Sequence, residues 1–332
     1  MPERKAVDHV TSVREIRRRK TVIQSTAQII RGMKLIATVR LTKDRARAEA
    51  FRPYFEELRG MGAMVLEERE WPEERKGPAG IVAFTSNRGL AGGYSQQIVR
   101  MIAGDGRFLP GTAVVYAVGK RGRDSLAAMG YEIRGDYSEA GERPDGVFAE
   151  KLAGRLLEDY EAGEIGEIYL AYTVFRSAVV QEPRLIRVLP AETEDGRKAE
   201  NSRKAENGLE TEDGLESENS LGRESGPAAM REETVGAGRA GTGEMEYEPD
   251  REQLRERMLP WYMGGMIYGA CLEAAASENG ARMRAMDSAA GNGKKLLEEL
   301  ELQYNRARQD TITRELTEIA AGAGEIMEHE EG

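Results

Sequence analysis

The last third of the chain carries an apolar stripe of a length that only a long helix can present. From residue 283 to residue 307, small and apolar side chains recur at alternating spacings of three and four, which is the period of an amphipathic helix. The stripe consists of Met283, Met286, Ala290, Gly293, Leu297, Leu300, Tyr304 and Ala307. The helix is expected from about Arg251 to about Met327. At 1.5 Å per residue it forms a rod on the order of 100 Å long, which no single globular domain encloses.

A second seamed helix is predicted at the other end of the chain, over about 10–68. Its seam positions lie seven residues apart, as in a coiled coil, and are Ile16, Ile23, Ile30 and Ala37. A coiled-coil repeat also has a second apolar position, and here polar side chains interrupt it. One side of this helix is therefore expected to meet something other than its intramolecular partner. The interrupting residues are Arg19, Thr26 and Arg40. Pro53 predicts a kink or a break. Two seamed helices with a compact region between them are expected to pair antiparallel.

The middle of the chain, about 78–190, alternates strand and helix signals. The short apolar runs that favour strands are Ile81–Thr85, Ala113–Val118, Ile165–Phe175 and Leu185–Leu189. The segments with helical spacing are Tyr94–Ala103, Arg121–Met129 and Val147–Tyr160. This alternation predicts an α/β domain with a mostly parallel sheet. The fold class is therefore α/β plus a long coiled coil, in which the terminal helices pair and the α/β domain lies beside one end of the rod.

Charge is distributed very unevenly along the chain. The formal net charge is −10, yet residues 191–246 hold 15 acidic and 7 basic side chains, with repeated ETEDG and RKAEN sequences. Such a segment has too little apolar surface to offset its ordering entropy, so it is predicted to be a disordered acidic insertion. Expansion of a surface loop without function and a regulatory or docking tail are both compatible with it. The helix expected over 247–327 follows.

The N-terminal region has the opposite charge. Residues 1–52 hold 14 basic and 5 acidic side chains, including the run Arg17–Lys20. In isolation, this pattern allows a helix that binds nucleic acid or a membrane surface, or simply a solvated helix face. The sequence contains no run of about 18 apolar residues, so no membrane span is predicted. The single Cys271 excludes an intrachain disulfide, and the two histidines, His9 and His329, lie near opposite termini.

The loop 85–94 (TSNRGLAGGY) is the strongest candidate for a binding site, because it follows a strand and opens a helix. It lacks the GxxxxGK[ST] and GxGxxG patterns, and no Lys follows its glycines. The glycines are better explained by the positive φ angles of a tight turn. Ser86 has neither a GxSxG context nor a histidine to activate it. We therefore expect no catalytic site, no metal and no cofactor.

Several motifs, in order along the chain, resemble the gamma subunit of F-type ATP synthases. The resemblance covers all but the insertion and the extreme termini. The segments that carry it are Val13–Ala37 (VREIRRRKTVIQSTAQIIRGMKLIA), Thr85–Ser95 (TSNRGLAGGYS), Tyr247–Asp250 (YEPD), Ser277–Asn292 (SENGARMRAMDSAAGN) and Tyr304–Gly322 (YNRARQDTITRELTEIAAG).

The resemblance implies a non-catalytic central rotor shaft. In that family the paired helices pass through the hexamer of alpha and beta subunits, and the α/β domain is the foot that meets the epsilon subunit and the ring of c subunits. Rotation driven by ion flow through the ring couples to ATP synthesis and hydrolysis. The implied location is peripheral, on the cytoplasmic face of a bacterial plasma membrane, without nucleic acid. The alternative is a coiled-coil adaptor derived from this family that no longer has a rotary role.

The resemblance also assigns roles to individual residues. Met33 and Lys34 resemble positions where the shaft meets a beta-subunit loop, although seam packing is an equal explanation for Met33. The residues that resemble the opposing side of that contact are Arg308, Gln309, Thr313 and Glu315. The basic N-terminal helix suits the family's acidic beta loop, with a solvated face as the alternative for its arginine run. The residues that resemble the foot segment near the c ring are Tyr247, Glu248 and Asp250.

The chain also departs from the family pattern. In the loop, Asn87, Ala91 and Ser95 replace an Asp, a Cys and an Asn. Glycines interrupt both long helices, and each interior Gly costs about 0.5–1 kcal/mol relative to Ala unless it allows helices to approach closely. These glycines are Gly32, Gly264, Gly265, Gly269, Gly280, Gly291 and Gly293.

Overall fold

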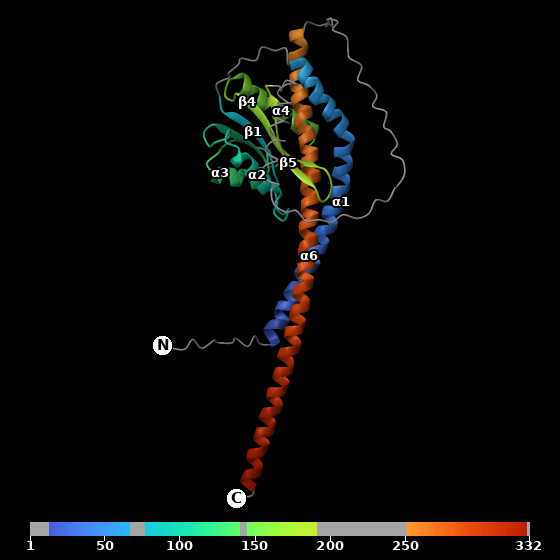
Figure 1. Cartoon of the computed structure of the whole chain (residues 1–332), viewed down its shortest axis with the longest axis vertical. Helices are drawn as coiled ribbons and strands as arrows, with labels where there is room; N and C mark the ends of the chain where they lie inside the picture. Colours follow the sequence, from blue (N-terminus) through green and yellow to red (C-terminus); the bar gives the residue numbers. More distant parts are fainter. Residues whose placement is uncertain (1–12, 67–76, 140–144, 191–250, 331–332) are drawn as a thin grey trace, which may run out of the picture.

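The computed structural model describes residues 13–66, 77–139, 145–190 and 251–330. Two long helices dominate it: α1 (Val13–Leu66) and α6 (Arg251–Glu330). They run antiparallel, side by side, and α6 extends past the start of α1 (Figure 1). Ion pairs fix the direction, because Lys20 bonds to Glu301 while Arg52 bonds to Glu273. The predicted antiparallel pairing of the terminal helices is confirmed. We call this pair of helices the shaft.

Helix α1 runs through Pro53 without interruption, so the break allowed by the sequence does not occur. The helix bows away from α6 and returns to it near its C-terminal end (Figure 1). The seam positions Ile16 and Ala37 are buried, as are the flanking Ala27 and Leu41. The periodic pattern therefore identified the face of α1 that packs on α6.

The α/β domain is built on one five-stranded sheet. Its strands are β1 (Ala79–Phe84), β2 (Ala113–Val118), β3 (Glu132–Asp136), β4 (Glu167–Phe175) and β5 (Gln181–Leu189). The order across the sheet is β3-β2-β1-β4-β5, and all neighbours are parallel except the β4–β5 pair. The prediction of a mostly parallel sheet is confirmed.

Two details of the sheet escaped the sequence patterns. Strand β3 reads EIRGD and lies at an edge, where polar residues are tolerated, so it has no apolar run to identify it. Strand β5 begins at Gln181, earlier than expected, because its first residues (QEPR) are polar and include Pro183. A proline is acceptable there because β5 is the other edge strand.

Helices cover both faces of the sheet. They are α2 (Tyr94–Gly104), α3 (Lys120–Ala128) and α4 (Gly146–Glu161). Alternate residues of β1 separate into two clusters: Ile81 and Ala83 pack with α2 and α3, whereas Val82 and Phe84 pack with α4 and the shaft. The side chain of Asp145 caps α4 by accepting a hydrogen bond from the Phe148 amide (2.8 Å). The domain thus has three layers, one of which it shares with the shaft.

Two pairs of glycines in the long helices have opposite surroundings. A Cβ added at Gly265 would lie 2.4 Å from Leu58 Cδ1, and one at Gly269 would lie 2.2 Å from Phe55 Cδ2. These two glycines therefore permit α1 to approach α6 closely beside the α/β domain. Gly291 and, on α1, Gly32 have no such neighbour within 4 Å. The predicted close approach explains the first pair of glycines, and no contact in the structure explains the second.

Candidate partner-binding surface of the shaft

The end of the shaft away from the α/β domain is progressively exposed. Lys20 Nζ lies 3.0 Å from Glu301 Oε1, so Val13, seven residues earlier on α1, lies about level with Arg308 on α6. Beyond that height no described residue of α1 accompanies α6, and the C-terminal end of α6 stands alone (Figure 1). Eighty helical residues correspond to a length of about 120 Å. The shaft therefore offers a long, narrow surface clear of the domain.

A second apolar face runs along α1, opposite to its seam. Its five aliphatic side chains are between 57% and 67% exposed, and they are Val22, Ile29, Leu35, Ile36 and Val39. On the far part of α6, large apolar side chains are similarly exposed, and they include Leu302, Leu316 and Ile319. An extended apolar surface of this kind is typical of a protein-binding site. The contact between one side of the N-terminal helix and something other than α6 stays a prediction, and this exposed face is where it would form.

Basic side chains border this apolar face, but they are not all unpaired. Arg19 Nη2 lies 2.6 Å from Glu15 Oε1, one turn away on the same helix, and Lys20 bonds across to Glu301. A groove of about 540 Å³ lies between the two helices. Its lining residues are Glu15, Arg18, Arg19, Val22 and Ile23 of α1 and Leu296, Glu299, Leu300 and Gln303 of α6. Two acidic and two basic side chains balance each other in this lining, so its apolar side chains are what it offers to a protein partner.

The predicted beta-contact residues fall into two groups on the shaft. Lys34 forms an ion pair with Asp287 of α6, and the neighbouring Met33 is half-buried. The four C-terminal members are all exposed, and they are Arg308, Gln309, Thr313 and Glu315. Asp287 and Arg308 are 21 residues apart on one helix, which corresponds to about 30 Å. The structure therefore does not bring the two groups together. The foot residues Tyr247, Glu248 and Asp250 and the insertion 191–246 lie outside the described residues.

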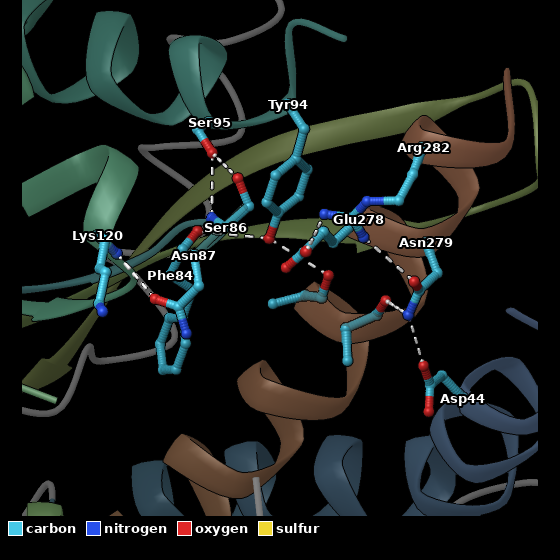
Figure 2. Close-up of polar contacts among 12 residues, drawn as sticks. Asp44, Phe84, Ser86, Asn87, Tyr94, Ser95, Lys120, Glu278, Asn279 and Arg282 are labelled. Carbon is cyan, nitrogen blue, oxygen red and sulfur yellow. Dashed lines mark hydrogen bonds and ion pairs between the residues drawn. The ribbon is translucent and has the colours of Figure 1, made fainter. Parts of the chain in front are cut away.

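The loop 85–94 is tied into the fold by its own polar groups. The Ser86 amide donates to Ser95 Oγ (3.0 Å), and Asn87 Oδ1 accepts from the Lys120 amide (3.0 Å). Figure 2 shows these contacts, together with Tyr94, whose hydroxyl points from α2 toward α6 and donates to Ala274 O (3.2 Å). The side chains and amides named here are thus engaged within the protein, as expected for a structural turn.

The conformation of this turn differs in part from expectation. Gly92 has φ 58°, which agrees with the explanation offered for the glycines, but Leu90 also adopts a left-handed φ of 67°. Gly89 serves a different purpose, because Arg121 Nη2 lies 2.9 Å from the position of a Cβ there. The glycine pattern indicated a tight turn correctly and did not identify the leucine that shares its strain.

A polar cluster at the junction between shaft and domain was missed by the sequence analysis. In Figure 2, Asn279 of α6 points toward Asp44 of α1, and its Nδ2 donates to Asp44 Oδ2 (2.8 Å). Arg282 joins the cluster by donating to Asn279 Oδ1 (3.3 Å) and to Glu278 Oε1 (2.5 Å). Burial raises the pKa of Glu278, although the Arg282 guanidinium opposes the shift. Burial likewise raises the pKa of Asp44, against the hydrogen bond from Asn279. The signal available in the sequence was a row of charged residues within an Ala-rich stretch of α6.

The described residues contain no group of three or more His, Cys, Asp and Glu side chains placed to hold a metal ion. Cys271 is buried in the apolar core, and burial raises the pKa of its thiol. Within the same part of the chain, none of the helices is both long and apolar enough to cross a bilayer.

Comparison with known proteins agrees with this architecture. The family model described as "ATP synthase" matches residues 12–325. The chain is 40% identical to the "ATP synthase gamma chain" of Lachnoclostridium phytofermentans, over 96% of this chain and 100% of that one. It is 32% identical to the "ATP synthase gamma chain, sodium ion specific" of Acetobacterium woodii, over 94% of this chain and 98% of that one.

Solved structures show the same fold. A chain from the rotor of the Euglena gracilis mitochondrial ATP synthase in rotational state 1 matches with a TM-score of 0.57 at 16% identity, over 90% of this chain and 98% of that one. A chain from the OSCP, F1 and c-ring assembly of the same enzyme in rotational state 3 matches with a TM-score of 0.59, also at 16% identity, over 95% of this chain and 94% of that one.

Proposed function

Since the chain belongs to the family of ATP synthase gamma chains, we propose that it is the central rotor stalk of an F-type ATP synthase. In this role it couples rotation of an ion-driven ring to ATP synthesis or hydrolysis in a catalytic hexamer. The observation that carries the proposal is the two-faced helix α1. One apolar face packs on α6, and the other is more than half exposed along a shaft that stands clear of the α/β domain.

A shaft that turns inside a ring of subunits needs this combination. It must be stiff enough to carry torque, which the seam between α1 and α6 supports, because paired helices resist bending better than a single helix. It must also present a surface to the surrounding subunits, and the exposed face of α1 and the far end of α6 do so. We infer that alpha and beta subunits surround this end of the shaft.

The beta contacts are proposed at two heights. Met33 and Lys34 lie about 30 Å from Arg308 and its neighbours along the axis, so one loop of a beta subunit cannot reach both groups at once. The half-buried side chain of Met33 takes part in the seam and leaves the rest of its surface to a partner. Lys34 already pairs with Asp287. A beta carboxylate would therefore have to compete with Asp287 or share the lysine with it.

The opposite end of the molecule is proposed to be the foot. The α/β domain would face the c ring and the epsilon subunit, with Tyr247, Glu248 and Asp250 near the ring. We infer a non-catalytic subunit, because the polar groups of the loop 85–94 are engaged in holding the turn. A peripheral position on the cytoplasmic face of a bacterial plasma membrane follows from the same assignment.

Co-purification tests the assignment. The tagged chain, expressed with its companion subunits, is expected to retain alpha, beta and epsilon subunits in fixed stoichiometry through gel filtration. A chain that comes down without them would be the coiled-coil adaptor instead. DNA or RNA that is retained at low salt and released steeply as salt rises would favour the nucleic-acid alternative.

The substitution Met33→Lys tests the beta contact. It adds a charge to the seam beside Lys34, and we expect it to lower ATP-driven ion pumping in membrane vesicles more than ATP hydrolysis or assembly. The matched control is Thr42→Lys, which adds the same charge at an exposed position of α1 nearer the α/β domain. Equal pumping-to-hydrolysis ratios in Met33→Lys, Thr42→Lys and the wild type would contradict the proposed contact of Met33 with a beta subunit.

A further inference from the structure

Strand β4 extends beyond the end of its neighbour β1, and the extended part bonds to the shaft. The last pairing between β1 and β4 joins Ala83 to Ala171, yet β4 continues to Phe175. Past this point, backbone groups of β4 bond to side chains of α6. Ser277 Oγ donates to Thr173 O (3.0 Å), and the Phe175 amide donates to Glu273 Oε2 (2.8 Å). Helix α6 thus satisfies the end of β4 where β1 has stopped.

Arg52 brings the second shaft helix into the same contact. Its Nη2 donates to Glu273 Oε1 (2.8 Å) and to Phe175 O (3.0 Å), and its Nε donates to Glu273 Oε1 (3.1 Å). Glu273 is only 6% exposed. One buried carboxylate therefore joins α1, α6 and β4, since each of its oxygens bonds to a different element.

The chemistry of this contact differs from that of its surroundings. Around it the domain and the shaft meet through apolar side chains, which resist separation but give little preference for one sliding position over another. Charge-assisted hydrogen bonds, by contrast, have a narrow geometry. A buried ion pair is in general weak evidence for added stability, because desolvation offsets its attraction. Its contribution here is to fix the position of β4 on the shaft.

A second polar contact between the shaft and the domain lies further along α6. Arg284 donates to Val179 O and to Gln181 Oε1 (2.8 Å), at the turn that joins β4 to β5. Arg284 is 11 residues from Glu273, which corresponds to about 16 Å along the helix. Two attachments at different heights prevent the domain from pivoting about either one.

We propose that Arg52 and Glu273 are positioning residues for torque transfer, which lock the α/β domain to the shaft so that rotation of one turns the other without slip. Arg284 supports the lock at the β4–β5 turn. The inference rests on the proposed rotary function and goes beyond it, because it assigns the mechanical connection between foot and shaft to named side chains.

The test uses the assembled complex in two assays. In the first, the hexamer is fixed to a surface and a probe on the α/β domain reports angular fluctuations, which Arg52→Leu is expected to broaden. In the second, the complex in membrane vesicles reports the number of ions pumped per ATP hydrolysed, which Arg52→Leu is expected to lower by about twofold or more. Arg52→Lys is expected to recover part of both, because an ammonium reaches Glu273 but lacks the fork that also bonds Phe175 O. The matched control is Arg45→Gln, which removes an exposed ion pair with Glu49 on the same helix, and it should behave as wild type.

A purely structural role predicts a different result. In that case Arg52→Leu would lower the melting temperature while the fluctuation width and the pumping ratio stayed at wild-type values, and the proposal would be overturned. If Arg52→Leu does not assemble, Arg52→Lys and Arg284→Gln are measured in the same way, and wild-type values in both would equally reject it. A wild-type chain that fails to enter a rotary complex would instead refute the proposed function.

Discussion

The shaft has two halves that bury apolar side chains to different extents. We call the part beside the α/β domain the near half and the part beyond the domain the far half. Beside the α/β domain, Phe55 and Leu58 of α1 are buried against α6, and glycines at positions 265 and 269 make room for them. In the far half, α1 buries one face and leaves aliphatic side chains such as Ile29 and Leu35 more than half exposed. The near half buries its apolar side chains within this chain, whereas the far half leaves an apolar face exposed, which under the proposed function is covered by other subunits.

This difference in burial assigns folding stability to the near half and partner binding to the far half. Residues of the near half contribute to the free energy of unfolding of the isolated chain, because they are already removed from water. Residues on the exposed face of the far half contribute little to it, and under the proposed function they become buried only on assembly. A substitution in one half should therefore be visible in folding, and an equivalent substitution in the other half should be visible in binding.

The largest expected contrast comes from one truncation in each half. Leu58→Ala removes a side chain that is 1% exposed, and it should lower the free energy of unfolding of the isolated chain by about 2–5 kcal/mol. Ile29→Ala alters a side chain that is 64% exposed, and it should stay within about 0.5 kcal/mol of wild type. Urea denaturation followed by circular dichroism measures both. A large decrease in the free energy of unfolding of Ile29→Ala would show that this side chain is already buried in the isolated chain, and would contradict an exposed partner-binding face.

A smaller contrast is expected from adding one methyl group to a glycine in each half. Gly269→Ala places a Cβ 2.2 Å from the buried ring of Phe55, so the helices must move apart, at a cost of about 1–3 kcal/mol. Gly291→Ala meets nothing within 4 Å and should instead stabilise the helix by about 0.5–1 kcal/mol. The same denaturation assay distinguishes them. Effects of equal sign in both variants would contradict the division of the glycines into two kinds.

Periodicity was sufficient to predict much of this architecture. The interval of seven between Ile16, Ile23, Ile30 and Ala37 identified the seam of α1, because burial on one face of a helix imposes that repeat. It did not fix how Met33 and Arg308 lie relative to each other along the axis. A repeating seam is compatible with several axial registers, and specific ion pairs such as Lys20 with Glu301 define the one that occurs.

Sequence patterns could not identify contacts that depend on three elements at once. Glu273 is a single charge in an Ala-rich stretch, and its role depends on the end of β4, 98 residues earlier in the chain, and on Arg52, 221 residues earlier. Edge strand β3 was missed for a related reason, since an exposed edge places few demands on residue type. Local patterns reveal which surfaces are buried, and they reveal little about which polar groups meet inside.

The boundary between the two halves is marked by Asp44, and it gives the smallest and most specific prediction. Burial raises the pKa of this carboxyl above its ordinary value, against the hydrogen bond from Asn279 and the nearby charges of Arg47 and Arg40. The stability associated with such a group is fully present below the unfolded pKa and is lost as pH rises through the folded pKa. Asp44→Asn removes that loss. The difference in unfolding free energy between variant and wild type should therefore shift in favour of the variant as pH rises above about 4, the unfolded pKa of an aspartate.

Asp105, in the α/β domain, provides a control of opposite sign. The hydrogen bond from Arg107 lowers the pKa of Asp105, so this residue contributes stability that is present above its unfolded pKa and is lost as pH falls through its folded pKa. Asp105→Asn should therefore shift in favour of the wild type as pH rises toward about 4, the unfolded pKa of an aspartate, and should change little above that. Parallel pH profiles for the two variants would mean that burial at the boundary of the two halves does not govern Asp44, and that the near half is more open to water than the packing of α1 on α6 indicates.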